Sequence, residues 1–334
     1  MAITEVKESL TSPKYLRPLF PEELADWSLV MGQSVGVHPF LSSAFLMAYQ
    51  TAVPQIRTIT MGIFEQEKLV GGFPVFERNW GPFRRAVNPP LVPYGSPFWL
   101  PSHTTIEIIE PVLDYFLETY ASTSMEFLPT IDLRSFSLPV PWHLNQRNTL
   151  LKTLLGNEDV TLQALSQKRR HAFRRASKLL IFQPDACFTE KHAALIAQSY
   201  ARHQRKLPIP VTNLLHLVNT LKTHQEAIVC SIAFKHLPEE PLAVVVFLSA
   251  KKTAYEWLAG ATLVPKLELM GFLLISAFTF LHHKGMEKLD FVGANHPSIA
   301  AFKRKFADAE IPYVYVQQTS NPFLRMAEWI RRKP

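Results

Sequence analysis

The sequence predicts an α/β protein made of two successive units with a similar order of elements. Its 334 residues exceed what one hydrophobic core usually serves, which favours two domains. The order of a helix pair, strands, a helix and a strand occurs in the first half and again in the second. Hydrophobic residues make up 47% and charged residues 19%, which excludes wholesale disorder. We therefore predict domains at 1–155 and 156–334, each with a mixed, mostly antiparallel central sheet.

In the first unit, the clearest patterns are a hairpin and a helix. Strand-like runs flank a polar tip at Glu65 to Lys68, which predicts the hairpin. Apolar residues three and four apart predict the helix, in which Pro111 must be tolerated or must produce a kink. The predicted elements are helices at 21–32 and 41–50, a hairpin at 56–78, a strand within 83–101, a helix at 104–122 and a strand at 125–135.

The second half contains a basic helix at 166–180, which either joins the two units or leads into the second. Its long apolar helix has a plausible C-terminal cap at Gly285. The remaining predicted elements are helices at 189–206 and 211–224, strands at 226–236, 241–251 and 253–261, the apolar helix at 266–285, a strand at 287–293, a short helix from Pro297 and a last strand that ends near Val316.

Composition and motifs exclude several classes of function. The formal net charge of +7 suggests an anionic ligand or partner, but does not by itself indicate nucleic acid. Cys187 and Cys230 are isolated, and His282 and His283 have no partner at metal-ligand spacing, so we predict no metal site. The first residues lack the apolar core of a secretory signal, and the apolar helix is too short for a membrane span. We expect a cytoplasmic protein.

The segment "NHPSIAAFKRKF", residues 295–306, carries a family resemblance. It resembles the segment after the fifth strand of GNAT acyltransferases, and Asn295, Ser298, Phe302 and Phe306 occupy the matching places. The basic helix "LSQKRRHAFRRASK" between two such units is similar to that of the tandem-domain FemAB-like group of peptidyltransferases and acetyltransferase-like proteins. In the first half, only the element order and "GGFPVF" support the resemblance. It implies two tandem GNAT-like domains.

The resemblance also implies an N-acyltransferase. An acyl or aminoacyl group would pass from acyl-CoA or aminoacyl-tRNA to a small-molecule or peptide-like amine bound between the units. Acyl-CoA would be a co-substrate, and no cofactor would be tightly bound. Two departures favour the FemAB-type enzymes, which use aminoacyl-tRNA, and leave the donor open. Phe302 stands where GNAT enzymes usually have a proton-donating tyrosine, and the stretch Gly260 to Gly271 lacks the glycine cluster of the pyrophosphate loop.

Lys303 is the leading catalytic candidate, together with Asn295. If the short helix begins at Pro297, Lys303 lies near the edge of its packed side, within reach of a cleft at the end of the sheet. Acyl transfer builds negative charge on a carbonyl oxygen, which a fixed cation stabilises. The resemblance implies a functional lysine here. The alternative is a lysine whose aliphatic stem only covers apolar surface.

Arg169 falls in the apolar stripe of the basic helix, where a buried guanidinium needs a partner. One interpretation is an internal ion pair, with Asp290 for example, or a bend at Ser166 that turns Arg169 outward. The other is that Arg169 binds a substrate phosphate or carboxylate. Arg170, Arg174 and Lys178, on the opposite face, are solvated residues or an electrostatic surface for RNA.

Other candidates rest on position. His296 lies in a loop at the carboxyl end of a strand, where open α/β sheets bind ligands, and is either a base or an ordinary loop residue. Tyr94 and Tyr255 are candidate substrate-binding residues that packing would explain equally well. Lys266 precedes a helix whose N-terminus would favour an anion. The cofactor-binding candidates are Lys266, Leu269, Met270 and Gly271.

Two further functions remain open. The chain could be a non-catalytic scaffold that keeps the fold and binds an anionic ligand or a protein, because the tyrosine and the loop are missing. It could also be an RNA-binding module built on the basic helix, although the sequence has no RNA-specific aromatic motif. No serine-hydrolase elbow and no P-loop occur in the sequence.

Overall fold

The computed structural model describes residues 13–133, 141–293 and 295–326. Within these residues the strands form one 13-stranded sheet, which is mostly antiparallel. The first half contains β1 (Lys14–Pro18), α1 (Leu24–Gln33), α2 (Ser43–Ala52), β2 (Arg57–Glu65), β3 (Lys68–Glu77), β4 (Arg85–Ala86), β5 (Phe98–Trp99), α3 (Thr105–Thr119), β6 (Ser122–Glu126) and β7 (His143–Thr153). The second contains α4 (Glu158–Gln163), α5 (Gln167–Leu179), β8 (Leu180–Gln183), α6 (Glu190–Arg202), α7 (Val211–Thr223), β9 (Ala227–Phe234), β10 (Leu237–Ala250), β11 (Thr253–Ala261), α8 (Leu269–His283), β12 (Lys288–Asp290), α9 (Pro297–Lys303) and β13 (Ala309–Thr319).

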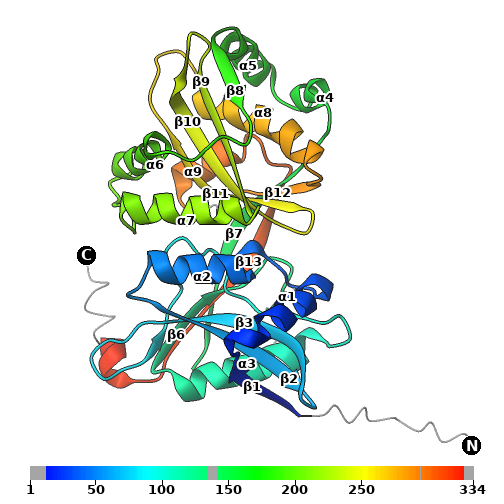
Figure 1. The fold of residues 1–334 in the computed structure, drawn as a ribbon, viewed down its shortest axis with the longest axis vertical. Helices are drawn as coiled ribbons and strands as arrows, with labels where there is room; N and C mark the ends of the chain where they lie inside the picture. The colour runs from blue at the N-terminus through cyan, green and yellow to red at the C-terminus, as the bar shows by residue number, and fades with distance from the viewer. Residues whose placement is uncertain (1–12, 134–140, 294, 327–334) are drawn as a thin grey trace, which may run out of the picture.

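Each half completes its sheet with a strand that arrives from the other half. The strand β13, at the end of the second half, pairs with β6 of the first half. The strand β7, at the end of the first half, pairs with β12 of the second. Because β7 and β13 also pair with each other, hydrogen bonds run continuously from one half to the other. Figure 1 shows these two strands passing between the halves.

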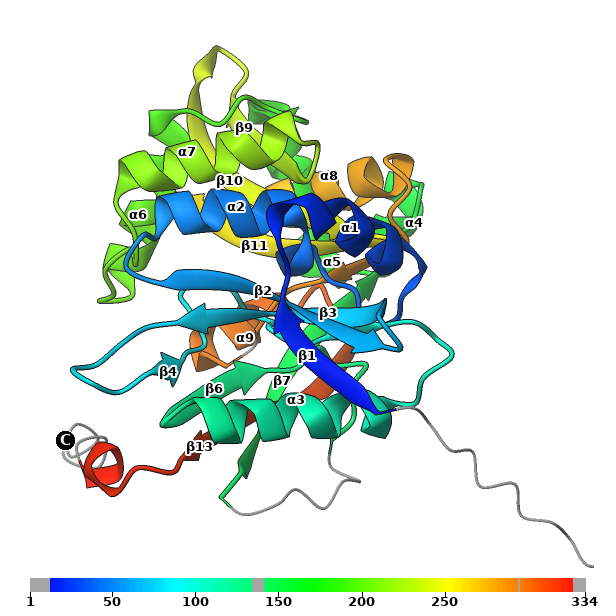
Figure 2. The same cartoon turned by 60° about the horizontal axis from the view of Figure 1, so that its bottom comes forward.

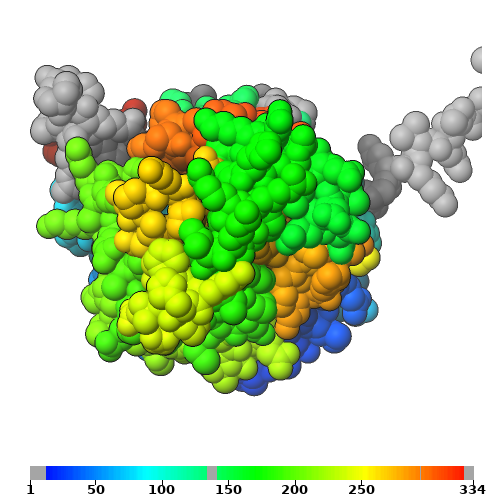
Figure 3. Space-filling model, turned by 90° about the horizontal axis from the view of Figure 1, so that it is seen from above, coloured from blue at the N-terminus to red at the C-terminus, as the bar shows by residue number. Residues whose placement is uncertain are grey.

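Helices cover both faces of the sheet. In the first half, α1 and α2 lie on the side that faces the second half, and α3 lies on the opposite side (Figure 2). In the second half, α6 and α7 pack on one face, and α5 and α8 pack on the other. The helix α2 packs against α7, which joins the halves through a second layer. Figure 3 looks onto the outer end of the second half, where α5 lies in front.

Local sequence explains where the helices begin and pack. The helix α3 begins after a capping box formed by Thr104 and Glu107, and it accommodates Pro111 in its interior. In the second half, α6 lies directly on β11 at Gly260, because a Cβ atom there would stand 2.5 Å from the main chain of Leu195. This close contact fixes α6 beside the strand that carries much of the candidate site.

The predicted fold class is confirmed: the chain is α/β with a mostly antiparallel sheet and helices on both faces. The predicted helices and the hairpin are present, and the basic helix is α5. The sequence misses β1, β7, β8 and α4, and the strand predicted at 125–135 is found at Ser122–Glu126. Residues 134 and 135 of that prediction, and the outer ends of the predicted domains, lie outside the described residues. The division at 155 stays a prediction.

Candidate active site

The strands β11 and β12 lie side by side for three residues, after which only β11 continues. Thr253–Tyr255 pairs in parallel with Lys288–Asp290, where β12 ends. The strand β11 extends to Ala261, and no described strand pairs with that edge of residues 256–261. An unpaired edge offers main-chain N–H and C=O groups to an extended ligand. We call residues 256–261 the open edge of β11; at its far end, the N–H and the carbonyl oxygen of Ala261 already bind the side chains of Ser199 and Arg202.

Lys303 lies beside the start of the open edge. The helix α9 begins at Pro297, as predicted. The side chain of Lys303 donates a hydrogen bond to the carbonyl oxygen of Phe291 and lies 3.5 Å from the carboxylate of Glu256. Lys303 is only 8% exposed. It therefore lies deeper than predicted, inside the packed side of α9 and not at its edge.

Glu256 is a site residue that the sequence analysis misses. It is 6% exposed, and its Oε2 has no hydrogen-bond partner among the described residues. Burial raises the pKa of this carboxyl group, and the charge of Lys303 opposes that shift. A carboxyl group with a raised pKa is suited to accept a proton near neutral pH. A lone glutamate within the apolar strand "TAYEWLAGA" is the signal that could have identified it.

Asp290, the last residue of β12, links the two halves. The hydroxyl of Tyr94 donates to Oδ2 of Asp290 at 2.9 Å, and the hydroxyl of Thr149 donates to Oδ1. Burial raises the pKa of the Asp290 carboxyl group. Tyr94 is fully buried, and its ring meets the ring of the buried Tyr255. Both tyrosines thus lie in the packed wall behind the site, and their predicted contact with substrate stays a prediction.

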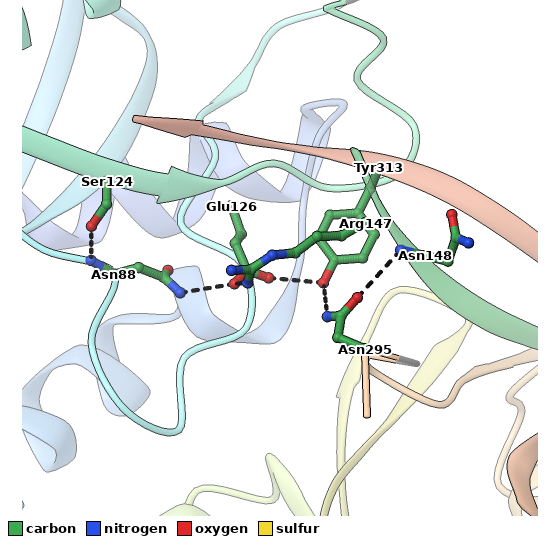
Figure 4. A network of polar contacts seen from close by, with 7 residues as sticks. All are labelled: Asn88, Ser124, Glu126, Arg147, Asn148, Asn295 and Tyr313. Atoms are coloured by element: carbon green, nitrogen blue, oxygen red, sulfur yellow. Dashed lines mark hydrogen bonds and ion pairs between the residues drawn. The ribbon is translucent and has the colours of Figure 1, made fainter. Parts of the chain in front are cut away.

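A second polar network surrounds Glu126, at the end of β6 (Figure 4). The side-chain amide of Asn88 and the hydroxyl of Tyr313 donate to its two oxygens at 3.0 and 2.9 Å, and Arg147 forms an ion pair with it. Burial raises the pKa of Glu126, and Arg147 opposes the shift. The side-chain amide of Asn295 donates to the Tyr313 hydroxyl at 2.9 Å. The predicted catalytic Asn295 is therefore connected to a buried carboxyl group of the first half.

A cavity of about 220 Å³ opens between the halves. The indole N–H of Trp257 donates to the carbonyl oxygen of Leu91 across it. Val292, in its wall, follows the residue whose carbonyl group binds Lys303. The lining residues are Asn88, Pro89, Leu91, Val92, Pro93, Tyr200, Trp257 and Val292. Part of a substrate in this cavity would therefore contact Val292, the residue next to the Phe291 carbonyl group that binds Lys303.

Arg169 forms an internal ion pair, as the first interpretation expects, but its partner is Glu268 and not Asp290, the example given. The chain does bend at Ser166, where α5 begins, but the bend leaves the Arg169 side chain only 12% exposed. Its guanidinium lies over the ring of Phe306 at 5.4 Å. Glu268 is the N-cap residue of α8. A carboxylate thus occupies the helix end where the resemblance places the pyrophosphate of a donor.

The other predicted cofactor-binding residues surround the same helix end. Leu269 and Gly271 are buried, Met270 is half-buried, and Lys266 is exposed in the preceding loop with a φ of 65°. A Cβ atom on Gly271 would lie 3.5 Å from Oε2 of Glu268, so the carboxylate lies over the first turn of α8. The part these four residues take in cofactor binding stays a prediction.

His296 lies apart from the buried groups. It is exposed, its Nδ1 lies 3.0 Å from the hydroxyl of Ser298, and its ring centre lies 5.6 Å from that of His203.

The structure therefore divides the predicted residues into two groups. The first group lies around the end of β12 and contains Lys303, Asn295, Tyr94 and Tyr255, while His296 lies exposed next to Asn295 in the sequence and apart from the buried groups. The second lies at the start of α8, where Phe306 packs beneath Arg169, and contains Arg169, Lys266, Leu269, Met270 and Gly271.

Within the described residues, no three histidine, cysteine, aspartate or glutamate side chains gather as metal ligands would. In the same part of the chain, no helix combines the length and apolarity needed to cross a membrane.

No family model and no curated protein sequence matches the chain. Solved structures do. FemX is 9% identical, with a TM-score of 0.67 over 95% of this chain and 100% of FemX. L-PGS from Bacillus licheniformis is 10% identical, with a TM-score of 0.57 over 95% and 97% of the two chains. A tandem GNAT protein from the clavulanic acid biosynthesis pathway is 11% identical, with a TM-score of 0.55 over 93% and 99%. The resemblance is therefore confirmed at the level of fold: this chain has the FemAB-like, tandem GNAT fold.

Proposed function

We propose that the chain is an N-acyltransferase that moves an acyl or aminoacyl group from an activated donor to an amine. The observation that carries this proposal is the open edge of β11 with the buried pair of Lys303 and Glu256 at its start. An extended donor arm that pairs with the open edge would bring its carbonyl group towards Lys303. The fold shared with FemX and with a tandem GNAT protein supports the same class of reaction.

Lys303 would stabilise the negative charge that forms during transfer. The neutral amine attacks the carbonyl carbon of the donor, a C–N bond forms, and an electron pair moves to the carbonyl oxygen. An ammonium group has three N–H donors. Phe291 accepts one hydrogen bond from Lys303 and the Glu256 carboxylate lies 3.5 Å away, so a further N–H could donate to the oxyanion. One preorganised donor of this kind contributes about 3 kcal/mol to the stability of the transition state.

The proton must then move from the amine to the leaving group. Phe302 occupies the place of the usual tyrosine and cannot donate a proton. We therefore favour transfer assisted by the substrate, in which the attacking amine gives its proton to the leaving group as the bond to that group breaks. Glu256, whose pKa is raised by burial, is the carboxyl group placed to accept this proton on the way.

The acceptor amine would enter through the cavity between the halves. Its walls come from a loop of the first half and from Tyr200, Trp257 and Val292 of the second. Asn88 lines this cavity, and its side-chain amide already donates to Glu126, so a polar group of the acceptor would join the Glu126 network at Asn88.

The start of α8 favours one class of donor over the other. A pyrophosphate at this helix end would meet the carboxylate of Glu268, which like-charge repulsion disfavours. This favours an aminoacyl ester, such as aminoacyl-tRNA, over acyl-CoA. If acyl-CoA is the donor, its pyrophosphate must replace Glu268 as the ion-pair partner of Arg169.

The proposal is tested by offering both donors. The protein is incubated with labelled acetyl-CoA or with a mixture of charged tRNAs, together with a panel of amines, and amide products are measured by mass spectrometry. We expect transfer from one donor, and a loss of about a hundredfold in Lys303→Met. The exposed neighbour Lys305 provides the matched control, and Lys305→Met should transfer at the rate of the unaltered protein.

If neither donor binds or reacts, the proposal is wrong. If a donor binds equally to the unaltered protein and to Lys303→Met, and no amine yields a product, the non-catalytic scaffold is the correct alternative.

A further inference from the structure

The helix α5 has an outer face of cations without acidic partners. Lys168, Arg174, Arg175 and Lys178 are exposed, and α5 contains no acidic residue. Within the described chain, none of the four forms an ion pair with a carboxylate. Exposed cations elsewhere are often neutralised: Lys191, Lys252, Lys284 and Arg304 each have an acidic partner. Some exposed cations elsewhere, such as Lys68 and Arg78, also have no carboxylate partner in the part of the chain that the structure describes, but α5 places four of them on one helix.

Helical geometry places these cations together. At about 100° per residue, Arg174, Arg175 and Lys178 fall on the side of α5 opposite the buried Phe173 and Ala176, and Lys168 falls on the flank of that side. Leu179 falls on the same flank as Lys168, about 40° from Arg175, and is 48% exposed. The outer face of α5 thus combines four positive charges with an exposed aliphatic side chain.

The neighbouring strands extend this face. The backbone N–H of Lys235 donates to the carbonyl oxygen of Leu179, so another exposed cation adjoins the end of α5. Leu237, in the same turn, is 40% exposed. In Figure 1 this region lies at the end of the molecule farthest from the first half. Figure 3 shows the green atoms of α5 and its neighbours as the front of that end.

We propose that the outer face of α5 docks the protein on the surface of an anionic lipid membrane. Lysine and arginine side chains are attracted to anionic headgroups, and exposed aliphatic side chains enter the boundary between headgroups and acyl chains. An RNA-binding surface would be expected to offer aromatic rings for stacking on bases and a groove along the backbone. The outward positions of α5 contain no phenylalanine, tyrosine or tryptophan, and the imidazole of His171 is the one ring among the exposed residues of this helix. The observations therefore favour a bilayer. This docking is independent of the transfer reaction.

The test is co-sedimentation of the full chain with vesicles of phosphatidylcholine alone, and with vesicles that also contain phosphatidylserine. We expect binding only to the anionic vesicles, and weaker binding as salt is added, because salt screens surface charge. The triple variant Arg174→Gln, Arg175→Gln, Lys178→Gln should lower the affinity by at least about tenfold. The control Lys68→Gln, Arg78→Gln, Arg325→Gln removes as much charge from exposed positions elsewhere that form no ion pair with the described residues, and it should bind as the unaltered protein does.

Leu179→Asn separates the apolar contact from the charge. It should lower vesicle binding severalfold and leave retention on a polyanion such as heparin unchanged. If the α5 triple variant and the control triple variant lose the same affinity for anionic vesicles, the proposal is contradicted, because binding would then depend only on net charge. Absence of binding to anionic vesicles would overturn it, as would binding to uncharged tRNA that anionic vesicles cannot displace.

Discussion

Each half contains a short parallel strand pair, and the two halves differ in whether the space beyond that pair is filled by the chain. In the first half, β4 and β6 pair in parallel over two residues, as β11 and β12 do over three in the second half. Beyond that pairing, the chain after β4 fills the gap, and the N–H of Gly95 bonds to the carbonyl oxygen of Glu126. Only a cavity of about 10 Å³ remains there. In the second half, the corresponding edge of β11 stays open, with Lys303 and Glu256 at its start.

This difference suggests a division of roles within one architecture. A closed gap contributes stability and offers no main-chain groups to a ligand, whereas an open gap keeps them available. The closed half still contributes to the other's site, since Tyr94 and Thr149 bind Asp290 at the end of β12. In the proposed function, the second half would therefore carry the reacting groups, and the first half would hold the strand ends in place.

The largest effect should follow from breaking the exchange of strands. Val316 is buried in β13, opposite Met125 of β6 and Leu144 of β7. Val316→Pro removes an N–H donor from a central strand and leaves an acceptor unpaired, which should lower the free energy of unfolding by about 5 kcal/mol. Chemical denaturation measures this loss.

Hydrogen exchange then tests whether the halves depend on one another. In Val316→Pro, amides of both β6 and β12 should exchange faster, because β13 and β7 join the two parts of the sheet. Val316→Ala keeps the N–H group and should cost only about 2 kcal/mol. Faster exchange confined to the first half would show that the halves fold separately.

An intermediate effect is expected from the buried pair at the open edge. Lys303→Met leaves the Glu256 carboxyl group buried without its cation, which should destabilise the protein by about 3 kcal/mol. Adding Glu256→Gln removes the stranded charge, so the double variant should regain much of that stability and still lack transfer activity. Thermal denaturation and product formation are measured on the same samples. Recovery of activity together with stability would show that Lys303 acts only as a structural partner of Glu256.

Much of the fold could be predicted because the long helices and strands have clear patterns in their own sequence. The helix at Thr105–Thr119 and the hairpin around Glu65 to Lys68 follow from periodicity and a polar tip. The strand β7 has no such signal: its first four residues, 143–146, are exposed and all polar except Leu144, and it is a strand because β12 and β13 pair with its two sides. Pairing with strands from the far end of the chain is not encoded in a local pattern.

The site was predictable only in part, for a similar reason. Lys303 and Asn295 were identifiable because they lie within a short motif. Glu256 and Glu126 become functional candidates only through burial and through partners distant in the sequence. Arg169 shows the limit most clearly: its need for a partner follows from the helical pattern, but Glu268 is 99 residues away. Tertiary packing decides which acidic side chain forms the ion pair with Arg169.

The smallest predicted effect concerns acid at the interface between the halves. His38, in the first half, is fully buried near the ring of Tyr94, and burial lowers its pKa from 6.5 to about 3. Between these values the unfolded chain binds a proton that the folded chain does not. Stability from this group is therefore lost as pH falls below 6.5, and amounts to about 2 kcal/mol at pH 5.

Asp290, which bonds to Tyr94 of the first half, should have the opposite effect on the pH dependence of stability. Burial raises its pKa, so the folded chain takes up a proton at a higher pH than the unfolded chain does, and acidification favours the folded state. Denaturation at pH 7.5 and pH 5 should show a smaller acid-induced loss in His38→Gln than in the unaltered protein, and a larger loss in Asp290→Asn. Equal losses in all three proteins would mean that neither buried group sets the acid response, and that the contact between the halves does not depend on the charge states assigned to them.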